Sequence, residues 1–239
     1  MPTQITSNRL LGIVISEYSE ASRQLARRKK WKMMSEEELW HELCLCILSS
    51  NVPFESAFSA VKHLLNEGLL SIDRIINEIE TEELIALELS KPIFLPPKKD
   101  GTLRKYRFPE IRASFIVKAG YKLYYEGPTI STILNKFESS RKVRDFLSDR
   151  IPGVGFKQAS LFLRNIGYME PLAIIDVHVL NFMKEIKLIS PESHNSSLSS
   201  KRYKMIEKKM QELAKKMGMS LSILDFAIWR TMRMIREEP

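Results

Sequence analysis

The sequence predicts an all-α fold. Apolar residues recur at helical spacing along most of the 239 residues, no alternating strand pattern is present, and residues that start and stop helices punctuate the chain. An apolar content of 44% is ordinary for a globular protein, and this length suffices to bury a core. We therefore expect one folded unit over residues 1–239.

The first third of the chain indicates amphipathic helices in series. Residues 5–30 are expected to form one helix with a basic end, and Ser35 with Glu38 forms a capping box that starts the next helix. That helix carries an apolar stripe and breaks at residues 49–51, before Pro53. Three further helical patterns follow, over residues 54–65, 72–79 and 82–89.

The second part begins with an irregular stretch, residues 92–105, which holds three prolines and four basic side chains and should lie on the surface. Pro109 fits the first position of the next helix. The remaining pattern predicts helices over residues 129–137, 141–147, 201–217 and from 220 onward, with a polar, serine-rich connection over 190–200.

The two cysteines, Cys44 and Cys46, lie two residues apart in an apolar helical run. Residues at this spacing do not share a helix face, so we expect buried thiols and no disulfide or metal pair. Two cysteines cannot supply the four thiolates of an iron–sulfur cluster, which excludes that cofactor.

One stretch, residues 146–180, contains the candidate functional residues. The run Ile151–Gly155 contains a proline and two glycines, so it must turn between two helices. A glycine turn that opens a helix leaves backbone N–H groups available for a phosphate. Lys157 falls in the first turn of the second helix, and Asp176 follows nineteen residues later.

The charge and the absence of targeting patterns indicate which kinds of partner and which location to expect. The net charge of +8 favours a polyanion, although many basic proteins bind no nucleic acid. No apolar run is long enough to span a membrane, and the first residues lack a signal-peptide pattern. We expect a cytoplasmic, nucleoid-associated protein that acts as a monomer without contact to a membrane.

The stretch IPGVGFK followed by LAIIDVH resembles the helix-hairpin-helix, Gly/Pro-rich loop and aspartate signature of the base-excision DNA glycosylases (the HhH-GPD superfamily). Other segments resemble the archaeal-type 8-oxoguanine DNA glycosylase/lyases, and the likeness covers most of residues 36–230: Glu42–Asn51, Arg107–Val117, Ala159–Gly167 and Leu224–Trp229.

The resemblance implies an architecture and an activity. Two helical subdomains would flank a DNA-binding cleft, one over residues 52–167 with the motif at 146–167, the other over residues 1–51 and 168–239. The expected activity is excision of a damaged base from double-stranded DNA, with abasic-site lyase activity through β-elimination. The expected base is 8-oxoguanine. Val177 stands where the family usually has a basic residue, and another damaged or mispaired base remains an alternative.

The resemblance also implies roles for the two catalytic candidates. Lys157 would attack the deoxyribose C1′ and form a Schiff base; its amine must be neutral to do so, and a helix start in a desolvated cleft disfavours the ammonium form. Asp176 would stabilise the positive charge that develops on the sugar. Lys157 could instead only bind phosphate. Asp176 could cap its helix, and its two roles are compatible.

The remaining candidates follow the family pattern with an alternative each. Asn51 would fill the gap left by the flipped base or cap a helix, and Phe108 would wedge between bases or serve as a hydrophobic staple. Trp229 with Asp225 would line the base pocket, or Trp229 would belong to the core. Backbone amides of Gly153, Gly155 and Phe156 and the side chain of His178 would contact DNA, and the carbonyls of Asp149, Ile151 and Val154 would hold K⁺ or Na⁺, with no other cofactor required.

Two other functions stay open on the sequence. A monofunctional glycosylase would use Asp176 to activate water, with Lys157 in a structural role. A protein of another class would be a DNA-binding module that uses the helix-hairpin-helix only to hold phosphates. An imine between lysine and DNA distinguishes the bifunctional enzyme from both alternatives.

Overall fold

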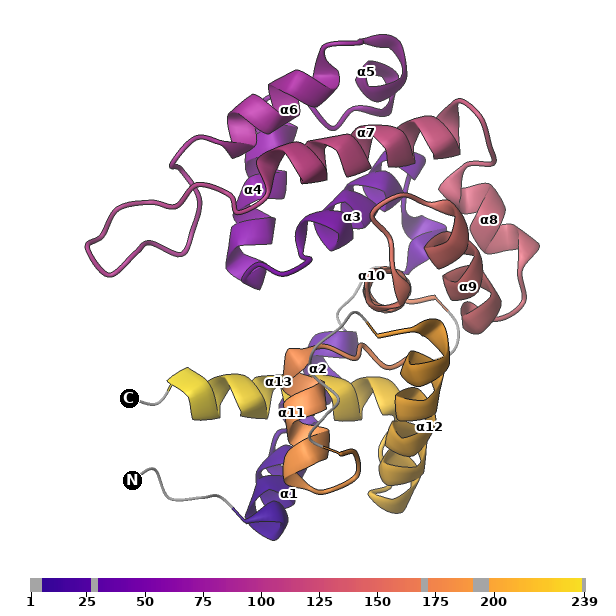
Figure 1. Cartoon of the computed structure of the whole chain (residues 1–239). Coiled ribbons are helices and arrows are strands. Elements are labelled where there is room, and N and C mark those ends of the chain that lie inside the picture. The colour runs from indigo at the N-terminus through magenta and orange to yellow at the C-terminus, as the bar shows by residue number, and fades with distance from the viewer. Residues whose placement is uncertain (1–5, 27–29, 169–171, 191–197, 238–239) are drawn as a thin grey trace. The chain divides into compact units, whose positions relative to one another are not determined.

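The computed structural model describes residues 6–26, 30–168, 172–190 and 198–237 (Figure 1). Within these ranges the regular structure is helical, and the only extended pairing is an isolated antiparallel bridge between Phe94 and Arg104. This confirms the predicted all-α class. The chain divides into two compact units, a terminal unit (Met1–Arg28 with Met169–Pro239) and a middle unit (Lys29–Tyr168). No helix among the described residues is long and apolar enough to cross a membrane.

The terminal unit is built around its last helix. That helix, α13, packs against all four other helices of the unit, and its buried face includes Leu224, Ala227 and Ile228. The helices of this unit are α1 (Ser7–Ser16), α2 (Tyr18–Ala26), α11 (Val177–Glu185), α12 (Ser200–Lys216) and α13 (Leu221–Glu237).

The middle unit is built around α3 and α7. The first packs against α4, α7, α8 and α10, and the second against α3, α5 and α6. Trp40 of α3 is fully buried and donates from its indole nitrogen to the carbonyl of Leu70 at 2.9 Å. The helices are α3 (Glu36–Leu48), α4 (Phe54–Asn66), α5 (Ile72–Asn77), α6 (Thr81–Leu89), α7 (Pro109–Tyr124), α8 (Ile130–Lys136), α9 (Ser140–Arg150) and α10 (Phe156–Asn165), with a 3₁₀ turn at Trp31–Met33.

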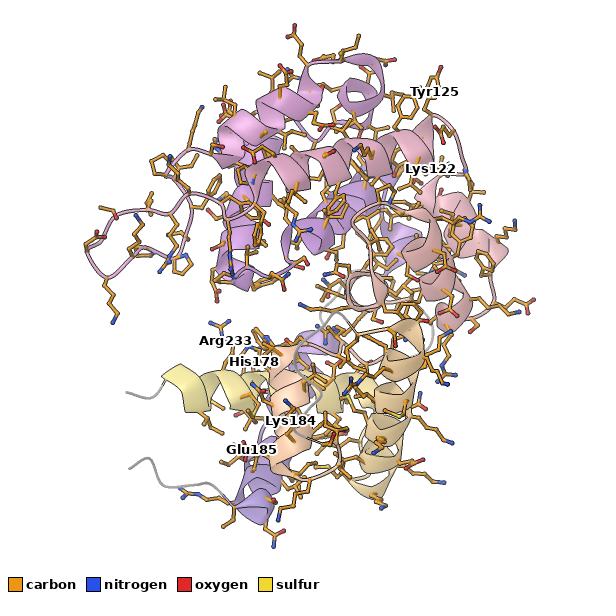
Figure 2. The ribbon with its side chains drawn as sticks, viewed as in Figure 1. Lys122, Tyr125, His178, Lys184, Glu185 and Arg233 are labelled. Carbon is orange, nitrogen blue, oxygen red and sulfur yellow. The ribbon has the colours of Figure 1, made fainter. Side chains whose placement is uncertain are left out.

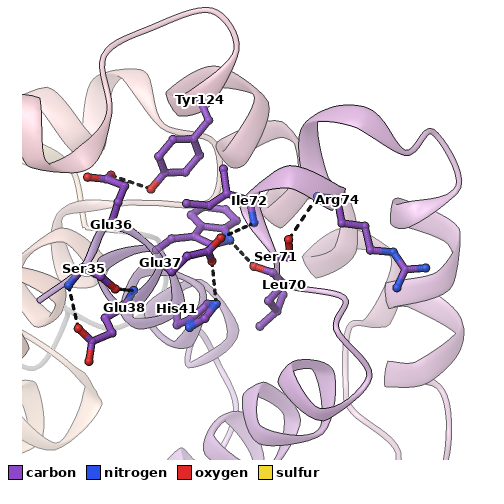
Figure 3. A network of polar contacts seen from close by, with 11 residues as sticks. Ser35, Glu36, Glu37, Glu38, His41, Leu70, Ser71, Ile72, Arg74 and Tyr124 are labelled. Atoms are coloured by element: carbon purple, nitrogen blue, oxygen red, sulfur yellow. Dashed lines mark hydrogen bonds and ion pairs between the residues drawn. The ribbon is translucent and has the colours of Figure 1, made fainter.

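The first turn of α3 is held by a polar network (Figure 3). Ser35 Oγ accepts from the Glu38 N–H at 3.2 Å while Glu38 Oε2 accepts from the Ser35 N–H at 2.8 Å, which confirms the predicted capping box. The Glu36 carboxylate accepts from the Tyr124 hydroxyl and from the first backbone N–H groups of α8. Burial, with a contribution from Glu36, raises the pKa of Tyr124. These bonds connect the start of α3 to α7 and to the start of α8.

Two expectations about the N-terminal region differ from the structure. The single helix expected over residues 5–30 is divided at Glu17, whose carboxylate pairs with Arg230 of α13 at 2.5 Å. The basic end of that predicted helix falls largely on residues 27–29, which lie outside the described ranges. The α3 helix groups with the middle unit, whereas the sequence assigned residues 1–51 to the subdomain that holds the C-terminus.

Candidate functional site

The glycine-rich hairpin, residues 151–155, joins α9 to α10. The Ile151 N–H closes α9 on the Leu147 carbonyl at 3.0 Å, and the Val154 N–H returns to the Ile151 carbonyl at 3.1 Å. Gly155 is the N-cap residue of α10 and no side chain caps that helix. The first N–H groups of α10 therefore lack an intrahelical acceptor and can donate to an anion.

Gly153 is the residue that the hairpin geometry requires to be glycine. Its φ of +77° lies in the left-handed region, and a Cβ atom there would stand 2.7 Å from Cβ of Phe115 on α7. The backbone can approach α7 only because that position has no side chain. The hairpin forms a surface hollow lined by residues 148–155, which include the three residues whose carbonyls the sequence suggested as cation ligands, Asp149, Ile151 and Val154.

Lys157 occupies the first turn of α10 and is half-buried. The α10 helix packs against α3, where burial and the nearby Glu42 raise the pKa of the Cys46 thiol, and the charges of Arg164 and Lys157 oppose that rise. Phe156, one residue earlier, is half-buried with the Arg144 guanidinium carbon 5.0 Å from its ring centroid.

Asn51 and Phe108, distant in sequence, lie beside the same arginine. Arg107 donates to the Asn51 carbonyl at 3.5 Å, and its guanidinium carbon lies 4.9 Å from the Phe108 ring centroid. Asn51 is exposed and has a φ of +60°, a conformation that asparagine tolerates better than most residues. The sequence drew no attention to Arg107; its place directly before the aromatic residue is the pattern that could have identified it.

Arg112 connects this edge to the hairpin. It is buried, donates to the Ser50 carbonyl at 3.1 Å, and lies 5.9 Å from the Phe108 ring centroid and 5.6 Å from that of Phe115. Phe108 is the N-cap residue of α7, and the arginine over its ring lies four positions later in the same helix. In the middle unit, Asn51, Phe108 and Gly153 thus belong to one connected set of contacts.

In the terminal unit, Asp176 is the N-cap residue of α11. Its Oδ1 accepts from the Val179 N–H at 2.9 Å, which is the capping role considered for it on the sequence. The side chain remains half-exposed, so a second role is compatible with the cap. His178 projects from the first turn of α11 and is labelled, with Arg233 of α13, in Figure 2.

The extended segment before Asp176 is held by three buried polar side chains. Asp225 Oδ2 accepts from the Ile174 N–H at 2.8 Å, Glu207 Oε1 from the Ala173 N–H at 3.2 Å, and the Tyr203 hydroxyl from the Ile175 N–H at 3.1 Å. Asp225, expected to line a base pocket, is only 2% exposed and positions the chain that leads to Asp176.

Glu207 and Tyr203 were missed on the sequence. Both lie on the apolar stripe of α12, one turn apart, in line with Met210. An acidic residue within the buried stripe of an otherwise basic helix is the pattern that could have identified Glu207, because a buried carboxylate needs hydrogen-bond partners.

Trp229 is half-buried on α13. Its ring stacks on Phe226 with centroids 5.7 Å apart and planes 11° from parallel, and the Arg233 guanidinium carbon lies 4.9 Å from its centroid. The ring therefore has one apolar and one cationic neighbour. Among the described residues, no group of three or more His, Cys, Asp or Glu side chains could hold a metal ion.

The hairpin between α9 and α10 on an all-helical frame defines the helix-hairpin-helix class of DNA-binding proteins. A family model described as 8-oxoguanine DNA glycosylase matches residues 21–219. The chain belongs to this family, as its sequence motifs predicted.

Individual relatives agree with this assignment. The chain is 30% identical over 221 residues to the 8-oxoguanine DNA glycosylase/AP lyase of Korarchaeum cryptofilum, covering 92% of this chain and 90% of the relative. It is 33% identical over 201 residues to that of Methanocaldococcus jannaschii, covering 84% and 83%.

Solved structures show the same fold. The 8-oxoguanine glycosylase/lyase of M. jannaschii in complex with a 15-mer DNA containing 8-oxoguanine aligns with a TM-score of 0.69 at 29% identity, over 88% of both chains. The 8-oxoguanine DNA glycosylase of Thermotoga maritima aligns with a TM-score of 0.72 at 28% identity, over 93% of this chain and 95% of the other.

Proposed function

We propose that this protein is a bifunctional DNA glycosylase and abasic-site lyase that removes 8-oxoguanine from double-stranded DNA. The observation that carries the proposal is a lysine in the first turn of α10, directly after an uncapped, glycine-rich helix start. The names of the relatives support the reaction class, and the M. jannaschii complex supports duplex DNA that contains 8-oxoguanine as substrate.

The hairpin would anchor the DNA. A phosphate can accept from the first N–H groups of α10, and because this contact involves no base it holds any sequence. An excised base must first be flipped out of the duplex, which costs a few kcal/mol. Asn51 and Phe108 are suited to offset this cost, since they share one edge of the middle unit and are joined through Arg107.

The chemistry would run through Lys157. Its neutral amine attacks C1′, the bond from C1′ to the base breaks, and the base leaves with the bonding electrons and takes up a proton. The sugar ring opens to an imine with the lysine nitrogen. Loss of a proton from C2′ then expels the 3′ phosphate and cuts the strand. Asp176 would stabilise the positive charge that develops on the sugar before the imine forms.

Further details of the site belong to the same proposal. Trp229 would stack on the flipped base, and Asp225 would act indirectly by fixing the segment before Asp176. His178 would contact the DNA backbone. A K⁺ or Na⁺ ion would be held by the carbonyls of Asp149, Ile151 and Val154, three residues that line one hollow. We expect the enzyme to act as a monomer on chromosomal DNA in the cytoplasm.

A panel of duplexes tests the proposal, each with one lesion at the same position and each paired with all four opposite bases. Base release and strand cleavage are measured separately under single-turnover conditions. We expect both with 8-oxoguanine, and cleavage alone with a preformed abasic site. Release of another base only would retain the reaction class and replace the substrate. If the protein binds the duplexes but releases no base, it is a DNA-binding module and not a glycosylase.

A further inference from the structure

The long connection between α6 and α7, residues 92–105, is an ordered arm (Figure 1). Phe94 at its start is fully buried, and Phe94 and Arg104 exchange both backbone hydrogen bonds at 3.0 Å. Ser56 of α4 donates to the Leu95 carbonyl at 2.6 Å. The base of the arm is therefore fastened to the core of the middle unit.

The tip of the arm is a closed turn. The Lys98 N–H donates to the Thr102 carbonyl at 2.8 Å, and Gly101 supplies the left-handed conformation with a φ of +83°. The Asp100 carboxylate accepts from the N–H and hydroxyl of Thr102 at 3.0 and 2.7 Å, and these bonds lower the pKa of Asp100. The one acidic side chain of the arm therefore forms hydrogen bonds within the turn.

The arm concentrates positive charge. Lys98, Lys99, Arg104 and Lys105 are all exposed, and against Asp100 they give a net charge of +3 over fourteen residues, out of +8 for the chain. The Arg104 side chain donates a hydrogen bond to the Pro96 carbonyl at 2.8 Å. The other three basic residues of the arm are the exposed lysines. In the described part of the chain none of the four basic residues is in an ion pair with an acid.

The arm ends at the edge that carries Asn51 and Phe108. Tyr106 is buried, and its hydroxyl donates to the Leu48 carbonyl. The backbone N–H of Tyr106 donates to the Leu89 carbonyl at 3.1 Å. The next residue, Arg107, reaches the Asn51 carbonyl. A duplex that is held at Asn51 and Phe108 would continue past the lysines of the arm.

We propose that the basic arm, residues 92–105, is a second DNA-backbone contact, in which Lys98, Lys99 and Lys105 bind phosphates of the duplex beside the lesion. This inference rests on the proposed function for the location of the DNA. Lysine is a flexible point charge with no fixed fork geometry, so these contacts hold the duplex without reading its sequence. Ordering the arm before binding reduces the entropy lost when the complex forms.

The test replaces the three lysines together, Lys98→Gln, Lys99→Gln and Lys105→Gln. Affinity is measured over a range of salt concentrations for undamaged duplex and for the same duplex with a stable abasic-site analogue. Each lost phosphate contact lowers the salt slope by about 0.9, so we expect a slope smaller by about 2–3 and affinity about tenfold or more weaker at low salt.

The matched control makes the same charge change elsewhere, with Lys208→Gln, Lys215→Gln and Lys216→Gln on the exposed side of α12. An arm variant whose salt slope equals that of this control on both duplexes would overturn the inference. If the wild-type protein releases no base while the arm variant loses affinity for undamaged duplex, the proposed function fails and the arm contact stands. An effect on an acidic protein partner alone, with DNA affinity unchanged, would also overturn it.

Discussion

At the residue scale, Asp176 shows how one side chain can serve the fold and the reaction. Its Oδ1 caps α11 through the Val179 N–H, and three buried side chains hold the segment that delivers it. Asparagine caps helices about as well as aspartate but carries no charge. The two roles can therefore be separated by substitution.

We expect Asp176→Asn to unfold at nearly the wild-type temperature and to lose base release by about 100-fold or more, as for removal of other electrostatic stabilisers of a transition state. Asp176→Ala should lose the same activity and also about 1 kcal/mol of unfolding free energy, because the cap is gone. Thermal unfolding and single-turnover kinetics on both variants measure the two effects. Full activity in the asparagine variant would leave Asp176 as a helix cap only.

At the element scale, the hairpin depends on one of its two glycines more than on the other. Gly153 has a φ of +77° and no room for a Cβ beside Phe115. Gly155 has a φ of −88°, and a Cβ at this position would lie 3.3 Å from the flexible end of the Gln158 side chain. The motif thus has a strained position and a tolerant one, although the sequence shows two glycines of equal appearance.

We expect Gly153→Ala to lower the unfolding free energy by about 1–2 kcal/mol from the backbone conformation alone, with more from the contact with Phe115. DNA affinity should fall with it, because the hairpin must move. Gly155→Ala is the control and should keep both stability and affinity near wild type. Urea unfolding and duplex binding decide this; equal losses in the two variants would contradict the assigned geometry.

Most elements could be predicted from the sequence because their determinants are local. The capping box at Ser35, the proline that starts α7 and the glycines 68 and 218, which follow α4 and α12 in left-handed conformations, all lie within a few residues of the helix ends that they define. The sequence did not predict the division of α1 from α2 at Glu17, and the partner of Glu17, Arg230, lies more than 200 residues away.

The candidate site divides in the same way. Lys157, Gly153 and Asp176 are found by motif because each is fixed by its own turn or helix start. The support of Asp176 by Asp225, Glu207 and Tyr203 depends on packing between α11, α12 and α13, so periodicity alone could not assign Asp225 to its observed hydrogen bond.

At the scale of the whole molecule, the chain divides into two compact units. Cys44 and Cys46 are both fully buried in the middle unit, and burial raises the pKa of each thiol well above its ordinary value. Both thiols should therefore react slowly, because reagents cannot reach them and because the fraction of thiolate is small.

Thiol labelling can consequently follow the unfolding of the middle unit. We expect no reaction of the native protein with a thiol reagent at pH 8, and two labelled thiols per chain in urea, with a midpoint equal to that of the middle-unit transition. A terminal-unit substitution such as Asp225→Ala should leave the labelling midpoint in place if the units unfold independently. Rapid labelling of the native protein would contradict the burial of both thiols.

Borohydride trapping followed by mass spectrometry shows whether Lys157 forms a covalent imine with damaged DNA. The protein is mixed with a duplex containing 8-oxoguanine, reduced, and digested, and the modified peptide is identified; Lys157→Gln is the control, with duplex binding measured in parallel. We predict that the adduct lies on Lys157 and is absent from the variant, which still binds DNA. An adduct on another residue, or equal trapping by Lys157→Gln, would show that Lys157 is not the nucleophile.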